Sequence, residues 1–114
     1  MVNEQQAGRL DDVFRALGDS TRRAMLKRLC AGERTVGDLA SPFAMTLAAA
    51  SKHIRTLERA GLVRRTVRGR THLCRIDARP LAKAQRWLRF YERFWSESLD
   101  LLERELKLEA RKDE

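Results

Sequence analysis

Four side chains are of the kinds that bind soft metal ions or act as nucleophiles, namely Cys30, His53, His72 and Cys74. Structural zinc sites usually combine four such ligands in closely spaced pairs, and neither Cys-x-x-Cys nor His-x₃-His occurs in the sequence. His72 and Cys74 are two positions apart in a predicted strand, so they share a face with Ile76. Cys30 continues the apolar stripe of a predicted helix and is expected to be a small core residue. We therefore predict no metal site and no cofactor.

The groups that carry out catalysis are also missing from the sequence. It contains no recognisable nucleophile with a base and an orienting group, and no glycine-rich phosphate loop, so the chain is predicted not to be an enzyme. Two cysteines fit a reducing compartment better than a disulfide scaffold. No apolar run approaches the ~18 residues of a membrane span, and the N-terminal residues lack a secretory pattern. We expect a cytoplasmic protein without a membrane partner.

The chemistry that the sequence does support is electrostatic. The 114 residues carry a formal net charge of +8, and the pI is near 10.5. Residues 52–75 contain eight basic side chains against Glu58 alone, whereas the segments before and after are almost balanced. Such a run can be a solvated face, but its confinement to one segment favours a surface that contacts the phosphates of a polyanion.

The N-terminal half is predicted to consist of helices that position this charge. Apolar residues at helical spacing predict a helix over residues 8–18 and a second one that is capped by Asp19 or Ser20 and ends near Gly32. Thr35 begins a capping-box pattern and opens a short third helix that ends at Ser41-Pro42.

A fourth helix is predicted from the cap Thr46 to Ala60, and Gly61 ends it. Its apolar stripe is predicted to face the core and comprises Leu47, Ala50, Ile54 and Leu57. Residues 62–76 then change to the period of β-strands and predict a hairpin with the tip Arg68-Gly69-Arg70.

The order of these elements predicts a mainly α fold with a small β-hairpin, the winged helix-turn-helix. We expect a single domain over residues 1–114, with the helix-turn-helix at 35–60 and the wing at 62–76. The helices at 8–18 and 78–108, which flank this DNA-binding core, are expected to form a dimer interface.

The face of the fourth helix opposite its apolar stripe carries no acidic side chain, and it provides candidate base-reading groups. Lys52 and Arg55 are expected to read bases, and Ala48 and Ala49 to contact thymine methyls. His53 lies on a flank, suited to a phosphate contact or to the core boundary. Each wing arginine can be a phosphate contact or a solvated side chain. The predicted DNA-binding residues are Thr46, Ala48, Ala49, Ser51, Lys52, His53, Arg55, Thr56, Arg64, Arg65, Arg68 and Arg70.

The last helix concentrates aromatic residues, with five of the seven in the chain within the nine residues 87–95. Large aromatic side chains are enriched at protein interfaces, so we expect a dimer interface here. An apolar effector pocket at the dimer seam is the alternative. The predicted interface residues are Leu10, Phe14, Leu17, Trp87, Leu88, Tyr91, Phe94 and Trp95.

Over roughly residues 10–106 the sequence resembles the ArsR/SmtB family of bacterial winged-helix repressors. The matching stretches are FRALGDSTR at 14–22, VGDLA at 36–40, ASKHI at 50–54, LERAGLV at 57–63 and RGR at 68–70. The resemblance implies a homodimer that binds an operator near a promoter, with the fourth helix in the major groove. Thr35-Val36-Gly37 stands where arsenic- and cadmium-type members have Cys-Val-Cys, and no histidine follows His72, as a zinc-type site would require.

The sequence thus predicts a sequence-specific regulator of double-stranded DNA, most simply a homodimeric repressor of a palindromic operator, with a small-molecule effector as an open possibility. One alternative is a metal- or thiol-responsive repressor that uses Cys30 and Cys74. A basic RNA-binding module is another, although residues 44–76 contain no aromatic side chain for base stacking. A protein-interaction module built on the aromatic helix would leave the basic segment unexplained.

Overall fold

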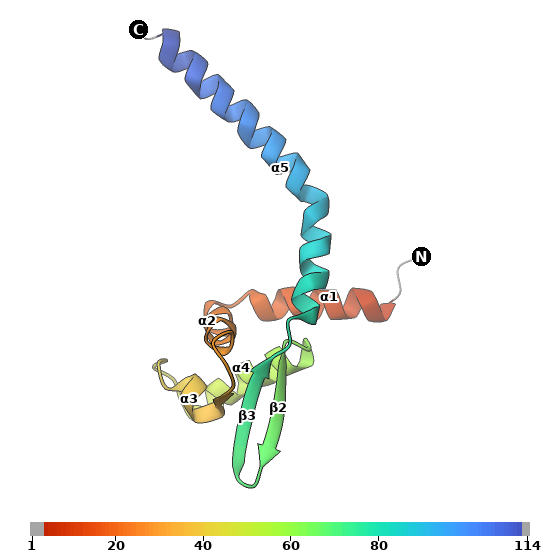
Figure 1. Ribbon diagram of the computed structural model, residues 1–114, viewed down its shortest axis with the longest axis vertical. Coiled ribbons are helices and arrows are strands. Elements are labelled where there is room, and N and C mark those ends of the chain that lie inside the picture. Colours follow the sequence, from red (N-terminus) through yellow and green to blue (C-terminus); the bar gives the residue numbers. More distant parts are fainter. Residues whose placement is uncertain (1–3, 113–114) are drawn as a thin grey trace. The chain divides into compact units, whose positions relative to one another are not determined.

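The computed structural model describes residues 4–112, which form five helices and three strands (Figure 1). In chain order these are α1 (Glu4–Leu17), α2 (Ser20–Leu29), β1 (Arg34–Thr35), α3 (Val36–Ala40), α4 (Leu47–Arg59), β2 (Val63–Arg68), β3 (Thr71–Ile76) and α5 (Arg79–Lys112). The described residues form two compact units, residues 4–84 and residues 85–112. The mainly α fold with a hairpin wing is confirmed, although α1 begins before and α5 ends beyond the predicted bounds.

Side-chain caps explain where three of the helices begin. Asp19, Thr35 and Thr46 each accept a hydrogen bond from the backbone N–H three residues later, at 3.0–3.1 Å. This contact satisfies one of the N–H groups that a helix leaves unpaired at its start. The backbone N–H of Arg22, together with the nearby guanidinium, also lowers the pKa of Asp19. All three caps lie at predicted positions.

A three-stranded antiparallel sheet replaces the two-stranded hairpin that the sequence predicts. Its order is β1-β3-β2, and Arg34 and Thr35 pair with Cys74 and Leu73. A strand of two residues is too short to show an alternating pattern, so only the pairing reveals it. The turn between β2 and β3 lies where predicted, and Gly69 occupies its tip with a φ of +62°.

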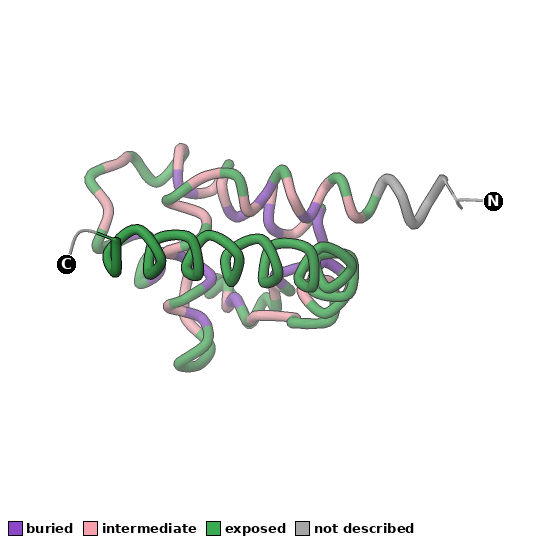
Figure 2. Tube along the Cα trace, turned by 90° about the horizontal axis from the view of Figure 1, so that it is seen from above, coloured by how far each residue is buried: buried purple, intermediate pink, exposed green. Residues whose placement is uncertain are grey.

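The core of the first unit is built from one side of each helix and the inner face of the sheet. Figure 2 shows the buried positions spread over these elements. The largest fully buried side chains are Met25, Leu29, Leu39, Ile54, Leu57, Leu62, Val13 and Cys74. α4 lies among them, because it contacts α1, α2, α3 and β2. Position and orientation of α4 are therefore fixed from several sides.

Two predicted core residues are exposed instead. Leu47 is 62% exposed, because it is the first residue of α4 and lies beyond the part of the helix that the other elements cover. Cys30 is exposed because α2 ends at Leu29, which leaves Cys30 as its C-cap. The buried cysteine is Cys74 on the inner face of β3, where burial raises the pKa of the thiol.

The second unit is the remainder of α5, and every one of its described residues is exposed (Figure 2). These include Phe94 at 70% and Trp95 at 42%. The rings of Trp87 and Tyr91, one helical turn apart, contact each other at an interplanar angle of 52°, with centroids 4.9 Å apart. Although α5 has 34 residues, none of the helices in the described part of the chain is apolar enough over a sufficient length to cross a membrane.

Two leucines at the ends of α4 provide a matched test of the core. Leu57 is fully buried, so Leu57→Ala should lower the free energy of unfolding by about 2–5 kcal/mol through lost burial and the cavity that remains. Leu47→Ala removes the same atoms from an exposed side chain. It should change the free energy of unfolding by about 0.5 kcal/mol or less. Urea unfolding at one fixed protein concentration measures both. Equal losses would contradict the placement of α4.

Candidate nucleic-acid interface

α4 presents a cationic face on the side opposite the core. Lys52, Arg55 and Arg59 are exposed, whereas Ala50, Ile54 and Leu57 are fully buried. The first turn contains no acidic residue. Among the described residues, neither Lys52 nor Arg55 has a carboxylate within ion-pair distance, so both charges are available to a ligand in solution.

Small side chains cover the start of this face. Thr46 and Ala48 are exposed, and Ala49 and Ser51 are half-buried. Short side chains let a helix backbone approach the floor of a groove, and the major groove of B-DNA is about 12 Å wide. Thr56 is less available than the sequence predicts, since its hydroxyl donates to the carbonyl of Lys52 at 3.1 Å.

His53 faces the protein rather than the open side of α4. Its Nδ1 lies 3.2 Å from Nη1 of Arg22, and Arg22 also donates to the carbonyls of Ala16 at 2.8 Å and Arg15 at 3.0 Å. A guanidinium can only donate, so Nδ1 is the acceptor. Of the two positions considered from the sequence, His53 takes the core boundary, where it joins α4 to α2 and the end of α1.

The wing places its arginines in two different environments. Arg65 lies on the inner face of the sheet, 2.6 Å from a carboxylate oxygen of Glu58 on α4 and 3.4 Å from Nδ1 of His72. Arg68 and Arg70 flank the tip and are exposed, with no carboxylate partner in the described part of the chain. The pair Arg65–Glu58 therefore attaches the wing to α4, and the tip arginines carry the free charge.

The outer face of the wing carries a further arginine, Arg75, which is not among the predicted DNA-binding residues. Arg64 and Arg75 are directly opposite each other in the register, and Arg68 follows on the same face. Arg75 is exposed. Arg64 is held by Asp77, with Nε 3.0 Å from the carboxylate oxygen. Alternation along the predicted strands could have placed Arg75 on the same face of the hairpin as Arg64 and Arg68, because every second residue shares a face.

The predicted residues are thus divided between an open face and a packed seam. Exposed are Thr46, Ala48, Lys52, Arg55, Arg64, Arg68 and Arg70, and half-buried are Ala49, Ser51, His53, Thr56 and Arg65. A groove of about 500 Å³ separates the start of α4 from the wing and is lined by Leu47, Ser51, Arg65, Arg70 and His72, among others. The cations that line it, the half-buried Arg65 and the exposed Arg70, both come from the wing.

The cysteines and histidines do not assemble into a metal centre. No group of three or more His, Cys, Asp or Glu side chains within residues 4–112 could hold a metal ion. Both cysteines are free thiols, one exposed and one buried.

Comparisons with known proteins identify the segment that contains α4. A family model described as a helix-turn-helix domain matches residues 17–66. The chain is 35% identical over 89 residues to the HTH-type transcriptional regulator Rv2034 of Mycobacterium tuberculosis, covering 78% of this chain and 80% of the relative. It is also 35% identical over 54 residues to the transcriptional repressor SdpR of Bacillus subtilis, covering 47% of this chain and 60% of SdpR.

A solved structure extends the match over both helix-turn-helix and wing. The crystal structure of an ArsR family transcriptional regulator aligns with a TM-score of 0.74 and 40% sequence identity, covering 79% of this chain and 93% of the other. Agreement in fold at this identity, together with the relationship to Rv2034, shows that the protein belongs to the ArsR family of winged helix-turn-helix transcriptional regulators.

Proposed function

We propose that the protein is a homodimeric repressor that binds a palindromic operator in double-stranded DNA. The observation that carries this proposal is the exposed face of α4, where Lys52 and Arg55 lie among small side chains without a carboxylate partner in the described residues. The name of SdpR, a transcriptional repressor, supports repression as the mode of regulation.

Base reading follows from the chemistry of this face. Lysine and arginine donate to the O6 and N7 acceptors of guanine, and the Ala48 methyl matches the C5-methyl of thymine. α4 contains no Asn or Gln, the residues that usually make bidentate contacts to adenine. We therefore infer an operator read through guanine and thymine, with DNA shape contributing at other positions.

The wing supplies contacts that hold the protein in register. Arg68 and Arg70 lie at a tip whose Gly69 has a positive φ, so the two side chains extend from a narrow turn. Arginines presented in this way suit phosphate contacts or insertion into a narrow minor groove. Arg75 extends the basic surface along the outer face of the wing.

The apolar surface of α5 supports dimerisation. Leu88, Trp95 and Leu102 recur every seven residues, as do Leu99 and Leu106, and each is at least 39% exposed. Exposed apolar side chains that gather on one side of a helix mark an interaction surface, and a seven-residue repeat is typical of helices that pair. The half-buried Leu10, Phe14 and Leu17 of α1 stay predicted members of the same interface.

Substitutions on α4 and the wing should separate base reading from phosphate contact. Lys52→Ala and Arg55→Ala should each weaken operator binding about 10- to 100-fold and relax the preference at particular base pairs, because a lost base contact costs ~1–3 kcal/mol. Arg70→Ala should weaken binding to operator and scrambled DNA by similar factors. Fluorescence anisotropy with an operator selected from a random pool measures both.

Lys27 provides the control for these variants, because it is an exposed lysine of α2, a helix that contributes no residue to the proposed surface. Lys27→Ala removes one charge and should leave operator affinity within about twofold. If Lys52→Ala, Arg55→Ala and Arg70→Ala also left affinity unchanged, the proposed orientation on DNA would be wrong.

Operator affinity should fall steeply with salt. If a dimer neutralises six to eight phosphates, the logarithm of the binding constant should fall against the logarithm of salt concentration with a slope of about −5 to −7. Titrations between low and physiological salt give this slope. A slope near zero would show that the basic surface is not what holds the DNA.

The dimer prediction concerns the two sides of α5. Trp95→Ala combined with Leu102→Ala should shift the protein toward monomer in sedimentation velocity and lower operator affinity, since both half-sites are then no longer bound together. Arg93→Ala combined with Lys107→Ala alters the polar side, where these residues pair with Glu97 and Glu103, and should leave the dimer intact. A monomeric wild-type protein that still binds a palindrome tightly would refute the dimer.

A further inference from the structure

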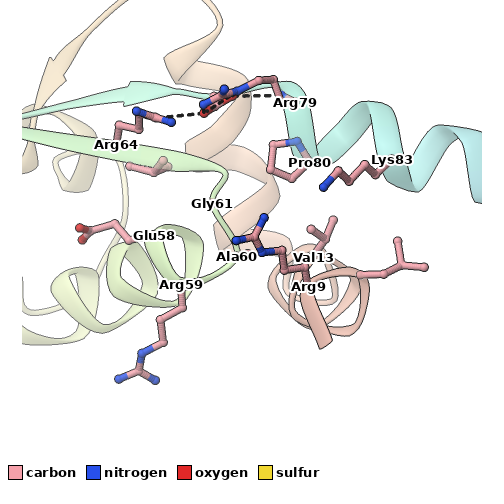
Figure 3. Close-up of a pocket in the computed structure, with 13 residues that line it drawn as sticks. Arg9, Val13, Glu58, Arg59, Ala60, Gly61, Arg64, Arg79, Pro80 and Lys83 are labelled. Atoms are coloured by element: carbon pink, nitrogen blue, oxygen red, sulfur yellow. Dashed lines mark hydrogen bonds and ion pairs between the residues drawn. The ribbon is translucent and has the colours of Figure 1, made fainter. Parts of the chain in front are cut away.

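A cavity of about 570 Å³ lies at the far end of α4 from the groove beside the wing. Residues of α1, the end of α4, the start of β2 and the first turns of α5 line it (Figure 3). Its apolar wall is formed by Leu10, Val13, Ala60, Val63 and Pro80. Sites for small molecules typically measure about 300–1,000 Å³ and combine an apolar lining with a few polar groups, so this cavity is of suitable size and chemistry.

Both carboxylates around the cavity have ion-pair partners, whereas some of the cations there have none among residues 4–112. Glu58 pairs with Arg65, which does not line the cavity, and Asp77 accepts from Arg64 at 3.0 Å and Arg79 at 2.7 Å. The hydrogen bonds from Arg79 hold the pKa of Asp77 far below its usual range, so this carboxylate stays ionised and bound to its arginines.

Three cations of the lining are left without a carboxylate partner in the described part of the chain. They are Arg9, Arg59 and Lys83. Figure 3 shows Arg9 and Lys83 pointing into the same space beside Pro80, whereas Arg59 points away from it. A negative group placed between Arg9 and Lys83 would meet two cationic donors from different helices, with the apolar wall behind them.

We propose that this cavity binds a small amphipathic organic anion, with its carboxylate between Arg9 and Lys83 and its apolar part against Leu10, Val13 and Pro80. Cationic groups exclude a cationic ligand by repulsion, and a neutral one would leave the convergent charges unused. The apolar wall equally disfavours a bare inorganic anion, which cannot bury hydrocarbon there.

Binding of the anion and binding of DNA should then affect each other, an inference that rests on the proposed function. The cavity wall includes Arg59 at the end of α4 and Arg64 at the base of the wing, so both DNA-contacting elements border the ligand. A bound carboxylate lowers the positive potential over about a Debye length, roughly 8–10 Å. The anion should therefore weaken operator binding, and DNA should weaken binding of the anion by the same factor.

Binding is tested on the full chain without DNA, so the result does not depend on operator binding. The probes are 4-phenylbutyrate, its alcohol 4-phenylbutan-1-ol, and inorganic phosphate, followed by ¹H–¹⁵N NMR. The proposal expects saturable shifts at the amides of Leu10 and Gly61 with the carboxylate, and at least about tenfold weaker binding of the other two probes. Equal binding of the alcohol or of phosphate, or shifts confined to residues 85–112, would overturn it.

Charge-removing variants locate the carboxylate. Arg9→Met and Lys83→Met keep most of the side-chain length and should each weaken 4-phenylbutyrate about tenfold or more. Arg15→Met makes the same change on the same helix outside the cavity, where Arg15 is exposed and paired with Asp12, and should bind as the wild type does. Unchanged affinity in both cavity variants, or a change of oligomeric state in sedimentation that accounts for the loss, would overturn the site.

The coupling is measured separately with the selected operator. Saturating 4-phenylbutyrate should raise the operator dissociation constant about fivefold or more, within the usual range of allosteric coupling, and should do so less in Lys83→Met. Binding of 4-phenylbutyrate with no effect on operator affinity would overturn the coupling alone. Failure to bind any DNA would overturn the proposed function while the NMR result still decides the site.

Discussion

Burial of one side of α4 is the constraint on which the rest of the first unit depends. Ala50, Ile54 and Leu57 are completely inaccessible to solvent, and α1, α2, α3 and β2 all contact this helix. Because side chains at helical spacing point to one side, fixing three of them also fixes where the opposite side points. The same packing that stabilises the unit therefore aims Lys52 and Arg55 outward, without any further interaction to orient them.

Electrostatics divides the basic segment into structural and available charges. Eight cations in residues 52–75 repel one another, and the two carboxylates nearest to them relieve part of this repulsion at particular places. Glu58 holds Arg65 in the seam between α4 and the wing, and Asp77 holds Arg64 and Arg79 at the wing base. The exposed Lys52, Arg55, Arg68 and Arg70 have no carboxylate partner among the described residues. Local neutralisation thus shapes the surface as much as the positions of the arginines do.

Features with a local cause were predictable from the sequence, and features that depend on distant contacts were not. The caps at Thr35 and Thr46 are determined by three or four neighbouring residues, and the buried stripe of α4 follows from helical spacing. In contrast, the exposure of Leu47 depends on how far the other elements cover α4, and β1 exists only because β3 lies beside it. The pairing of Arg65 with Glu58 likewise required the wing to fold against α4.

The wing is anchored at one end only, and this gives it mechanical freedom. Val63 and Cys74 are buried at its base, whereas all residues from 66 to 72 are exposed. Segments with few buried apolar contacts open and bend at low free-energy cost, so the hairpin behaves as a flexible lever whose fixed end lies at the seam with α4. In the proposed complex with DNA, its tip would follow phosphate backbones of different curvature while α4 keeps its place. Variation in groove width would then be absorbed by bending of two strands rather than by rearrangement of the core.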